Sequence, residues 1–174
     1  MQDKDSCMTE AFLKAVAPIL KQKIAFTKPL LKKFGEPALK VLRETVQEET
    51  FKEWKELAKQ EGNTSMENLV DLLWNRLCRP LGFQFTITPL ATGEEPSAIQ
   101  IHCTRCPLYE FAKELGDLDL GFEFHCAQDP FIAEAFGDNI GFRQTKWLMR
   151  GDDHCDHYYY RKSAGNKTKT QESR

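Results

Sequence analysis

Residues 83–104 read FQFTITPLATGEEPSAIQIHCT, and this stretch decides the fold class. Apolar and polar side chains alternate over Phe83–Thr88 and again over Ile99–Thr104, which is typical of a strand with one buried face. Gly93 and Pro96 lie between the two runs and indicate a turn. The stretch therefore predicts an antiparallel hairpin.

A second hairpin is expected nearer the C-terminus. Its strands are predicted from Phe142 to Met149 and from Cys155 to Arg161, with a turn at Gly151. Between the two hairpins, Pro107 and Pro130 each begin a short helix, because proline favours the first helical position. The sequence therefore predicts two hairpins joined by two short helices.

The N-terminal half has helical periodicity instead. Pro18 predicts a break in the first helix, and Thr27 the start of a second, short one. A long helix is expected from about Glu36 to Gln60, and Thr64 with Glu67 forms a capping-box pair for the next helix. Helices followed by hairpins predict an α+β fold, with the helical half packed on a four-stranded antiparallel sheet. Residues 1–162 form one domain, and the polar residues 163–174 are expected to be a disordered tail.

Composition excludes several classes of function. The 174 residues include 24 Lys and Arg and 26 Asp and Glu. The resulting net charge of -2 argues against binding nucleic acid or an anionic membrane. No apolar run approaches the roughly 20 residues that span a bilayer. The first ten residues, MQDKDSCMTE, lack the apolar core of a secretory signal, so a cytoplasmic location is expected. The oligomeric state stays open.

The cysteines are the unusual feature. There are six, and three of them directly follow a histidine, in His102-Cys103, His125-Cys126 and His154-Cys155. In a cytoplasmic chain long enough to build a core, reduced thiols used for packing, metal binding or catalysis are a better interpretation than disulfides. Cys7 is assigned to a loose N-terminus and Cys78 to packing.

Cys106 precedes Pro107 and is therefore predicted to be a helix N-cap. Cysteine is a poor cap on stability grounds, but helix N–H groups stabilise a thiolate and lower its pKa. The functional interpretation is a reactive thiol, and the alternative is an inert buried one. Cys126 lies near the next helix start and Cys155 opens the last strand, so we expect the three sulfurs to converge on one pocket.

His125 is the candidate acid or base, because it lies in a loop beside Cys126; a solvated loop histidine is the alternative. A divalent metal held by Cys106, Cys126 and Cys155 also stays open. The spacing Cys-x2-Cys-x19-Cys-x28-Cys, however, has one close pair where structural zinc sites usually have two.

Three motifs carry a family resemblance. Thr104-Arg105-Cys106-Pro107, Phe124-His125-Cys126 followed by Asp129, and Gly151-Asp152-Asp153-His154-Cys155-Asp156 resemble the L-2-amino-thiazoline-4-carboxylic acid hydrolase family. His157 stands where the family usually has an aromatic residue. This departure is expected to affect the strand face opposite Asp156 more than the site itself.

The resemblance implies a small-molecule hydrolase, in which water opens a thiazoline ring and yields N-carbamoyl-cysteine. Carried over to this chain, Cys106, Cys126 and Cys155 become the site thiols and Asp129 the matching carboxylate. Arg105, to hold the substrate acid, and Asp152 are the expected substrate-binding residues. The order of elements also resembles the ligand-binding domain shared by 4-vinyl reductases and transport-particle subunits, which is an analogy of fold. The alternative function is a non-catalytic, sensor-like module that binds a small ligand or a metal through the same thiols.

Overall fold

The computed structural model describes residues 8–91 and 96–162. Its elements are, in chain order, α1 (Glu10–Ala15), α2 (Ala17–Phe34), α3 (Glu36–Glu61), α4 (Met66–Val70), the π-helical η1 (Asp71–Cys78), the 3-10 turn η2 (Arg79–Leu81), β1 (Gln84–Ala91), β2 (Pro96–Arg105), α5 (Pro107–Glu114), α6 (Leu118–Phe124), the 3-10 turn η3 (Cys126–Gln128), α7 (Asp129–Phe136), β3 (Ile140–Arg143), the 3-10 turn η4 (Leu148–Arg150) and β4 (Cys155–Arg161). The predictions for Cys7, for Gly93 in the first turn and for the tail 163–174 lie outside the described residues.

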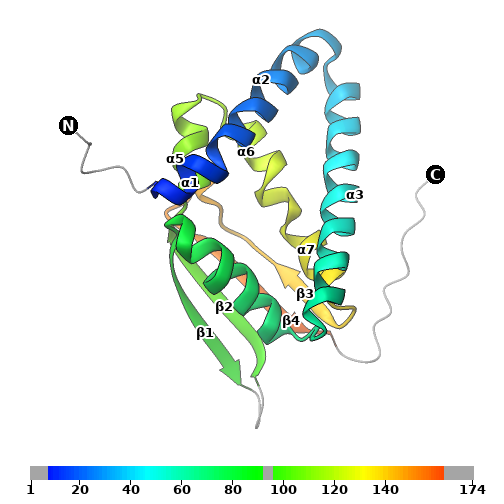
Figure 1. Ribbon diagram of the computed structural model, residues 1–174, viewed down its shortest axis with the longest axis vertical. Coiled ribbons are helices and arrows are strands. Elements are labelled where there is room, and N and C mark those ends of the chain that lie inside the picture. Colours follow the sequence, from blue (N-terminus) through cyan, green and yellow to red (C-terminus); the bar gives the residue numbers. More distant parts are fainter. Residues whose placement is uncertain (1–7, 92–95, 163–174) are drawn as a thin grey trace.

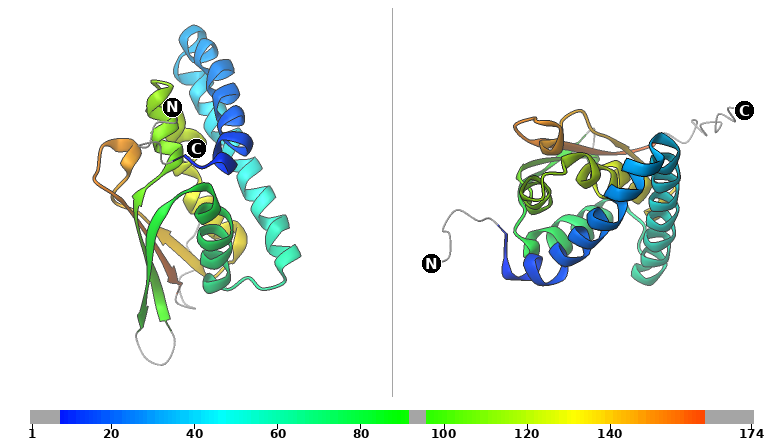
Figure 2. Two further views of the ribbon diagram at one scale, coloured as in Figure 1. Left: turned by 60° about the vertical axis from the view of Figure 1, so that its left-hand side comes forward. Right: turned by 90° about the horizontal axis from the view of Figure 1, so that it is seen from above.

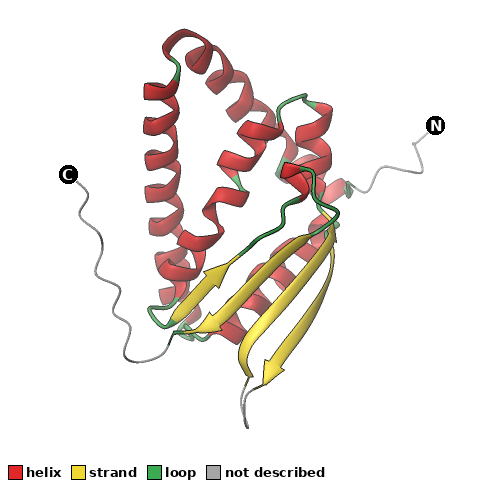
Figure 3. Cartoon of the chain, turned by 180° about the vertical axis from the view of Figure 1, so that it is seen from behind, coloured by secondary structure: helices red, strands yellow, loops and turns green. Residues whose placement is uncertain are grey.

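The four strands form one antiparallel sheet in the order β1-β2-β4-β3, so the two hairpins join through β2 and β4. The helices cover one face of this sheet (Figures 1 and 3), and the two further views agree (Figure 2). The predicted α+β class is confirmed. Of the helices in the described residues, none has the length and apolar character to span a bilayer.

The register of β2 against β4 determines which side chains point toward the helices. The alternation predicted from the sequence holds, because every second residue of both strands is buried. The buried cross-strand pairs are Ile99 with Tyr159, Ile101 with His157, and Cys103 with Cys155. Two cysteines, Cys103 and Cys155, and one histidine are thereby placed beneath the helical layer.

The helical half differs from expectation in two places. The first break is at Val16, and Pro18 lies in the first turn of α2. Its missing N–H removes no helical hydrogen bond there, because the first N–H groups of a helix have no partner within it. The predicted restart at Thr27 is wrong, because α2 continues through Pro29. Leu20 and Ile24 of α2 are buried against α6, and this packing outweighs the lost backbone hydrogen bond.

The N-cap of α4 also differs. The Ser65 hydroxyl, rather than Thr64, accepts a hydrogen bond from the Asn68 N–H at 3.2 Å.

The segment between the hairpins carries a helix that the sequence did not predict. Gly121 interrupts the LDLGFEF sequence of α6 and weakens its helical signal. A Cβ on Gly121 would lie 2.7 Å from the Ala112 Cβ, so glycine permits the close packing of α6 on α5. The predicted third strand is also shorter than expected: β3 ends at Arg143, and η4 occupies Leu148–Arg150.

Candidate functional site

A cavity of about 290 Å³ lies between the buried face of the sheet and the helices. Its walls come from α2, α3, η1, β2, α5, α6, η3, α7 and β4, so most of the fold contributes to it. The lining residues with a thiol, imidazole, carboxylate or ammonium group are Cys78, Cys103, Cys106, Cys126, Cys155, His125, His157, Asp129, Lys23 and Glu53. The structure thus brings Cys106, Cys126 and Cys155 to one cavity and adds Cys78 and Cys103, all as free thiols.

Cys106 is the N-cap of α5, as predicted, with an extended backbone at φ -131°. Cys106 is 8% exposed as a residue, and burial raises the pKa of its thiol well above the ordinary value. The predicted thiolate at Cys106 is therefore wrong, because loss of hydration outweighs what the start of one short helix supplies.

The other two site thiols are also protonated at neutral pH. Burial, with the nearby charge of Asp129 adding to it, raises the pKa of Cys126 well above the ordinary value. Burial raises the pKa of Cys155 to about 11, and its sulfur accepts a hydrogen bond from the Leu148 N–H at 3.3 Å. As a whole residue, Cys126 is half-buried, whereas Cys106 and Cys155 are buried.

Asp129, at the start of α7, contacts a partner that the sequence analysis did not place in the site. Its Oδ2 lies 3.3 Å from Nε2 of His157, and both side chains are largely buried. The His157 ring packs edge-on against Trp74, with 4.7 Å between the ring centres. Nδ1 of His157 has no hydrogen-bond partner in the described residues.

His157 points to the face of β4 opposite to that of Asp156, as expected. That face lines the cavity, so the departure from the family pattern changes the site itself. The signal was present in the sequence, because His157 is two residues after Cys155 on a strand and therefore shares its face.

His125 lies between α6 and η3 and lines the same cavity. Burial, together with the charge of Lys23, lowers the pKa of His125 to about 4, so its imidazole is neutral at pH 7. Its Nε2 is buried without a partner among the described residues. The interpretation of His125 as a solvated loop histidine is therefore wrong, and a neutral ring is available to a ligand.

Arg105 and Asp152 are placed outside the cavity lining. The Arg105 guanidinium pairs with Glu110 at 3.1 Å. Asp152 accepts a hydrogen bond from the Trp147 N–H at 2.7 Å. Their predicted substrate-binding roles have no support in this arrangement.

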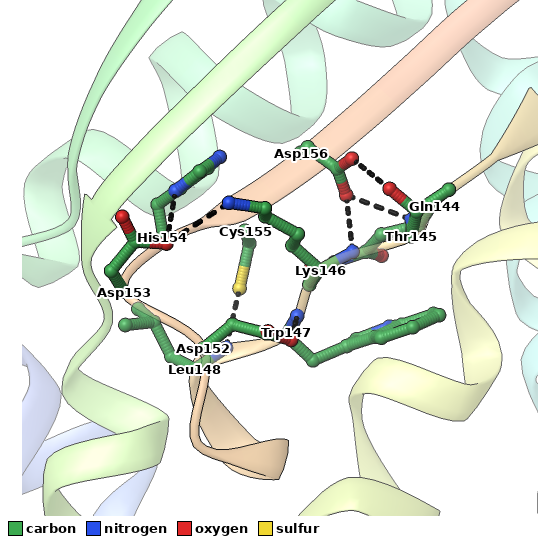
Figure 4. A network of polar contacts seen from close by, with 10 residues as sticks. All are labelled: Gln144, Thr145, Lys146, Trp147, Leu148, Asp152, Asp153, His154, Cys155 and Asp156. Carbon is green, nitrogen blue, oxygen red and sulfur yellow. Dashed lines mark hydrogen bonds and ion pairs between the residues drawn. The ribbon is translucent and has the colours of Figure 1, made fainter.

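Figure 4 shows what the Gly151–Asp156 motif does. The Asp156 carboxylate accepts hydrogen bonds from the N–H groups of Thr145 and Lys146 at 2.8 and 2.6 Å, and from the Thr145 hydroxyl. Together with Asp152 it fixes the connection between β3 and β4 on both sides of Cys155. The two aspartates thus position the Cys155 sulfur.

The arrangement does not fit a preformed metal centre. Within residues 8–91 and 96–162, no three His, Cys, Asp or Glu side chains are grouped so that they could hold an ion. The thiols line the cavity without forming a ligand set for an ion.

Comparison with solved structures finds the same fold in a trafficking protein particle complex subunit 3 from Naegleria fowleri, whose crystal structure holds covalently bound palmitic acid. The two chains are 13% identical with a TM-score of 0.51, and the match covers 84% of this chain and 95% of the other. At that identity the likeness concerns the fold alone. Among curated proteins, none matches significantly.

The family comparison is more informative. The model described as L-2-amino-thiazoline-4-carboxylic acid hydrolase matches residues 13–159, which include every residue that lines the cavity. The chain belongs to the L-2-amino-thiazoline-4-carboxylic acid hydrolase family.

Proposed function

We propose that this protein hydrolyses a small cyclic amidine acid of the 2-amino-thiazoline-4-carboxylate type in this cavity. One observation carries the proposal: in a chain of this family, Cys106, Cys126, Cys155, His125 and the Asp129–His157 pair line a single cavity. The volume of 290 Å³ is at the lower end of the roughly 300–1,000 Å³ of ordinary ligand pockets and suits a one-ring substrate.

The overall reaction adds one water. The water oxygen bonds to the ring carbon between sulfur and nitrogen, the bond from that carbon to the ring sulfur breaks, and the sulfur leaves as a thiol. The product is N-carbamoyl-cysteine. A nucleophile, a proton acceptor and a proton donor are needed, and each must lie near the reacting carbon.

Cys126 is the proposed nucleophile and Asp129 its base. Cys126 is the half-buried residue of the three, and the charge of Asp129 acts on its thiol. Asp129 takes the Cys126 proton as the sulfur bonds to the ring carbon, and it returns that proton to the departing ring sulfur. Water then adds to the carbon, the bond to Cys126 breaks, and Cys126 recovers a proton.

His125 and His157 support these steps. The unpartnered Nε2 of His125 can hydrogen-bond an amidine nitrogen, since the ring is neutral at pH 7. His157 holds the Asp129 carboxylate in position. Cys106 and Cys155 line the buried side of the cavity as neutral thiols.

A Cys126→Ser variant tests the proposal. A serine hydroxyl is a far weaker nucleophile, so turnover of 2-amino-thiazoline-4-carboxylate should fall by at least about 100-fold. Product formation is followed by mass spectrometry, with circular dichroism to verify folding. Cys78→Ser is the matched control, because Cys78 lines the cavity at the end of η1 but has no proposed role in the reaction. Equal turnover by wild type and Cys126→Ser would remove Cys126 from the mechanism.

A second function is favoured by one observation, the raised pKa of every site thiol discussed above. Protonated thiols suit a non-catalytic cavity that binds a small ligand. If the wild type binds the thiazoline acid but forms no product, with or without added divalent metal, this binding module replaces the hydrolase.

A further inference from the structure

We propose that the cavity rim is a subsite for a zwitterionic ligand, in which Lys23 binds a carboxylate and Glu53 binds a cationic amidine. The rim is defined as Lys23 of α2 together with Thr50 and Glu53 of α3, and all three line the cavity. The inference rests on the proposed function, because it states which features of the substrate are recognised. It assigns the carboxylate-binding role to Lys23, which no motif in the sequence indicates.

Lys23 is exposed, whereas Cys103, Cys106 and Cys155 on the cavity floor are buried, so the cavity opens toward α2. Its ammonium lies 5.5 Å from the centre of the Phe124 ring, next to His125. The effect of its charge on the pKa of His125 supports this closeness. Lys23 therefore presents a positive charge at the entrance to the thiols.

The charge of Lys23 is available to a ligand. Within residues 8–91 and 96–162, no carboxylate pairs with Lys23, whereas Lys28 of the same helix pairs with Asp117 at 3.2 Å. No other Lys or Arg side chain in this part of the chain lines the cavity. The helix itself carries no Asp or Glu over Ala17–Phe34, so nothing on α2 competes with an incoming carboxylate.

Glu53 provides the opposite charge from α3. Its neighbours Glu49 and Glu56 on that helix pair with Lys52 and Lys59, but Glu53 has no ion-pair or hydrogen-bond partner among the described residues. Asp129, deeper in the cavity, already contacts His157. Glu53 is thus the carboxylate at the rim that remains for a cation.

The two charges come from two helices that diverge from the Gly35 turn and flank the helical layer (Figure 1). A ligand that carries a carboxylate and an amidinium offers one group to each of these charges. A cyclic amidine acid has both groups on one ring. The rim would therefore select for the zwitterion over a ring that lacks the carboxylate.

The test compares the thiazoline acid with 2-aminothiazoline, which lacks the carboxylate. Dissociation constants are measured by calorimetry in the Cys126→Ser background, and KM and kcat are measured in otherwise wild-type protein. Lys23→Gln should weaken binding of the acid by about 10- to 100-fold and leave binding of 2-aminothiazoline unchanged. KM should rise with little change in kcat, and Lys23→Arg should restore most of the affinity.

Two further variants complete the experiment. Lys21→Gln is the matched control, because Lys21 lies on the same helix, is exposed and is not among the cavity residues. Glu53→Gln should weaken both ligands, since both carry the amidine, whereas Glu48→Gln on the same helix should weaken neither.

The outcomes separate the two proposals. If Lys23→Gln and Lys21→Gln bind the acid equally, the rim proposal is overturned while turnover by the wild type still supports the hydrolase. If the carboxylate preference depends on Lys23 but no variant or wild type forms product, the rim stands and the hydrolase fails. A wild type that binds both ligands equally overturns the rim proposal.

Discussion

The carboxylate of Asp129 lies 3.3 Å from Nε2 of His157, and this contact joins the start of α7 to the middle of β4 at the cavity. Removing either group would leave the other buried without its partner, which is more costly than the contact itself is favourable. The pair therefore couples the stability of the fold to the proposed base.

A double-mutant cycle measures this coupling. Asp129→Asn and His157→Phe should each lower the free energy of unfolding in urea by about 1–3 kcal/mol. The double variant should be less destabilised than the sum of the two by about 1 kcal/mol, because each single change already breaks the contact. Strict additivity would mean that the two side chains do not interact in solution.

The rate at which each thiol is labelled should depend on its accessibility and not on its position at a helix start. With iodoacetamide, Cys126 is expected to react before Cys106 and Cys155, since it is the half-buried residue of the three. All three reactions should be slow at neutral pH and accelerate about 10-fold per pH unit, because burial raises each thiol pKa. Peptide mapping by mass spectrometry identifies the labelled sites. Labelling of Cys106 first at pH 7 would show that the N-terminus of α5 outweighs burial.

The buried His125 side chain should make the free energy of unfolding depend on pH. Its pKa is about 4 in the folded protein, lowered first by burial, and about 6.5 when unfolded. Between these values the unfolded chain binds the additional proton, so stability falls as pH decreases from about 6.5 to about 4, by up to about 1.4 kcal/mol per pH unit.

A His125→Gln variant should lose this component. Urea unfolding at several pH values, with His154→Gln as the control at an exposed histidine–aspartate contact, measures the difference. Parallel pH profiles for wild type and His125→Gln would contradict the buried neutral ring.

Asp156 is expected to be structural. Burial alone would raise its pKa, but the hydrogen bonds from Thr145 and Lys146 lower it below the ordinary value. Asp156→Asn should cost about 1–3 kcal/mol of unfolding free energy at neutral pH. The stabilisation is present above the unfolded pKa of about 3.9 and is lost as pH falls through the lower folded value, so wild type and variant should converge in acid.

Asp153→Asn provides the comparison for Asp156, because Asp153 is fully exposed and should change stability little. A destabilisation of Asp153→Asn equal to that of Asp156→Asn would show that the loop depends on net charge and not on the hydrogen bonds of Asp156.

The sequence predicted the sheet well because alternation is local. The pattern at Ile99, Ile101 and Cys103 specified the buried face without knowledge of the helices. The course of α2 through Pro29 and the helix around Gly121 were not predictable in the same way, because both depend on packing against distant elements. Local signals thus determine the strands, and tertiary contacts determine the irregular helices.

The same distinction applies to the site. The positions of Cys106, Cys126 and Cys155 at helix starts and a turn correctly predicted that they line one cavity. Strand alternation also indicated that His157 shares the face of Cys155. The protonation of the thiols could not be predicted, because it results from burial under helices far away in the chain. Lys23 also lies outside every motif, so only the folded chain reveals its closeness to His125.

The cavity is assembled from two separate parts of the chain. The thiols of the floor belong to η1, β2, η3, β4 and the β2–α5 junction, whereas Lys23 and Glu53 belong to α2 and α3. On the proposed assignment, Lys23 and Glu53 can be exchanged without altering the thiols. Changing these two charges would then redirect the protein to differently charged rings while its cysteines are preserved.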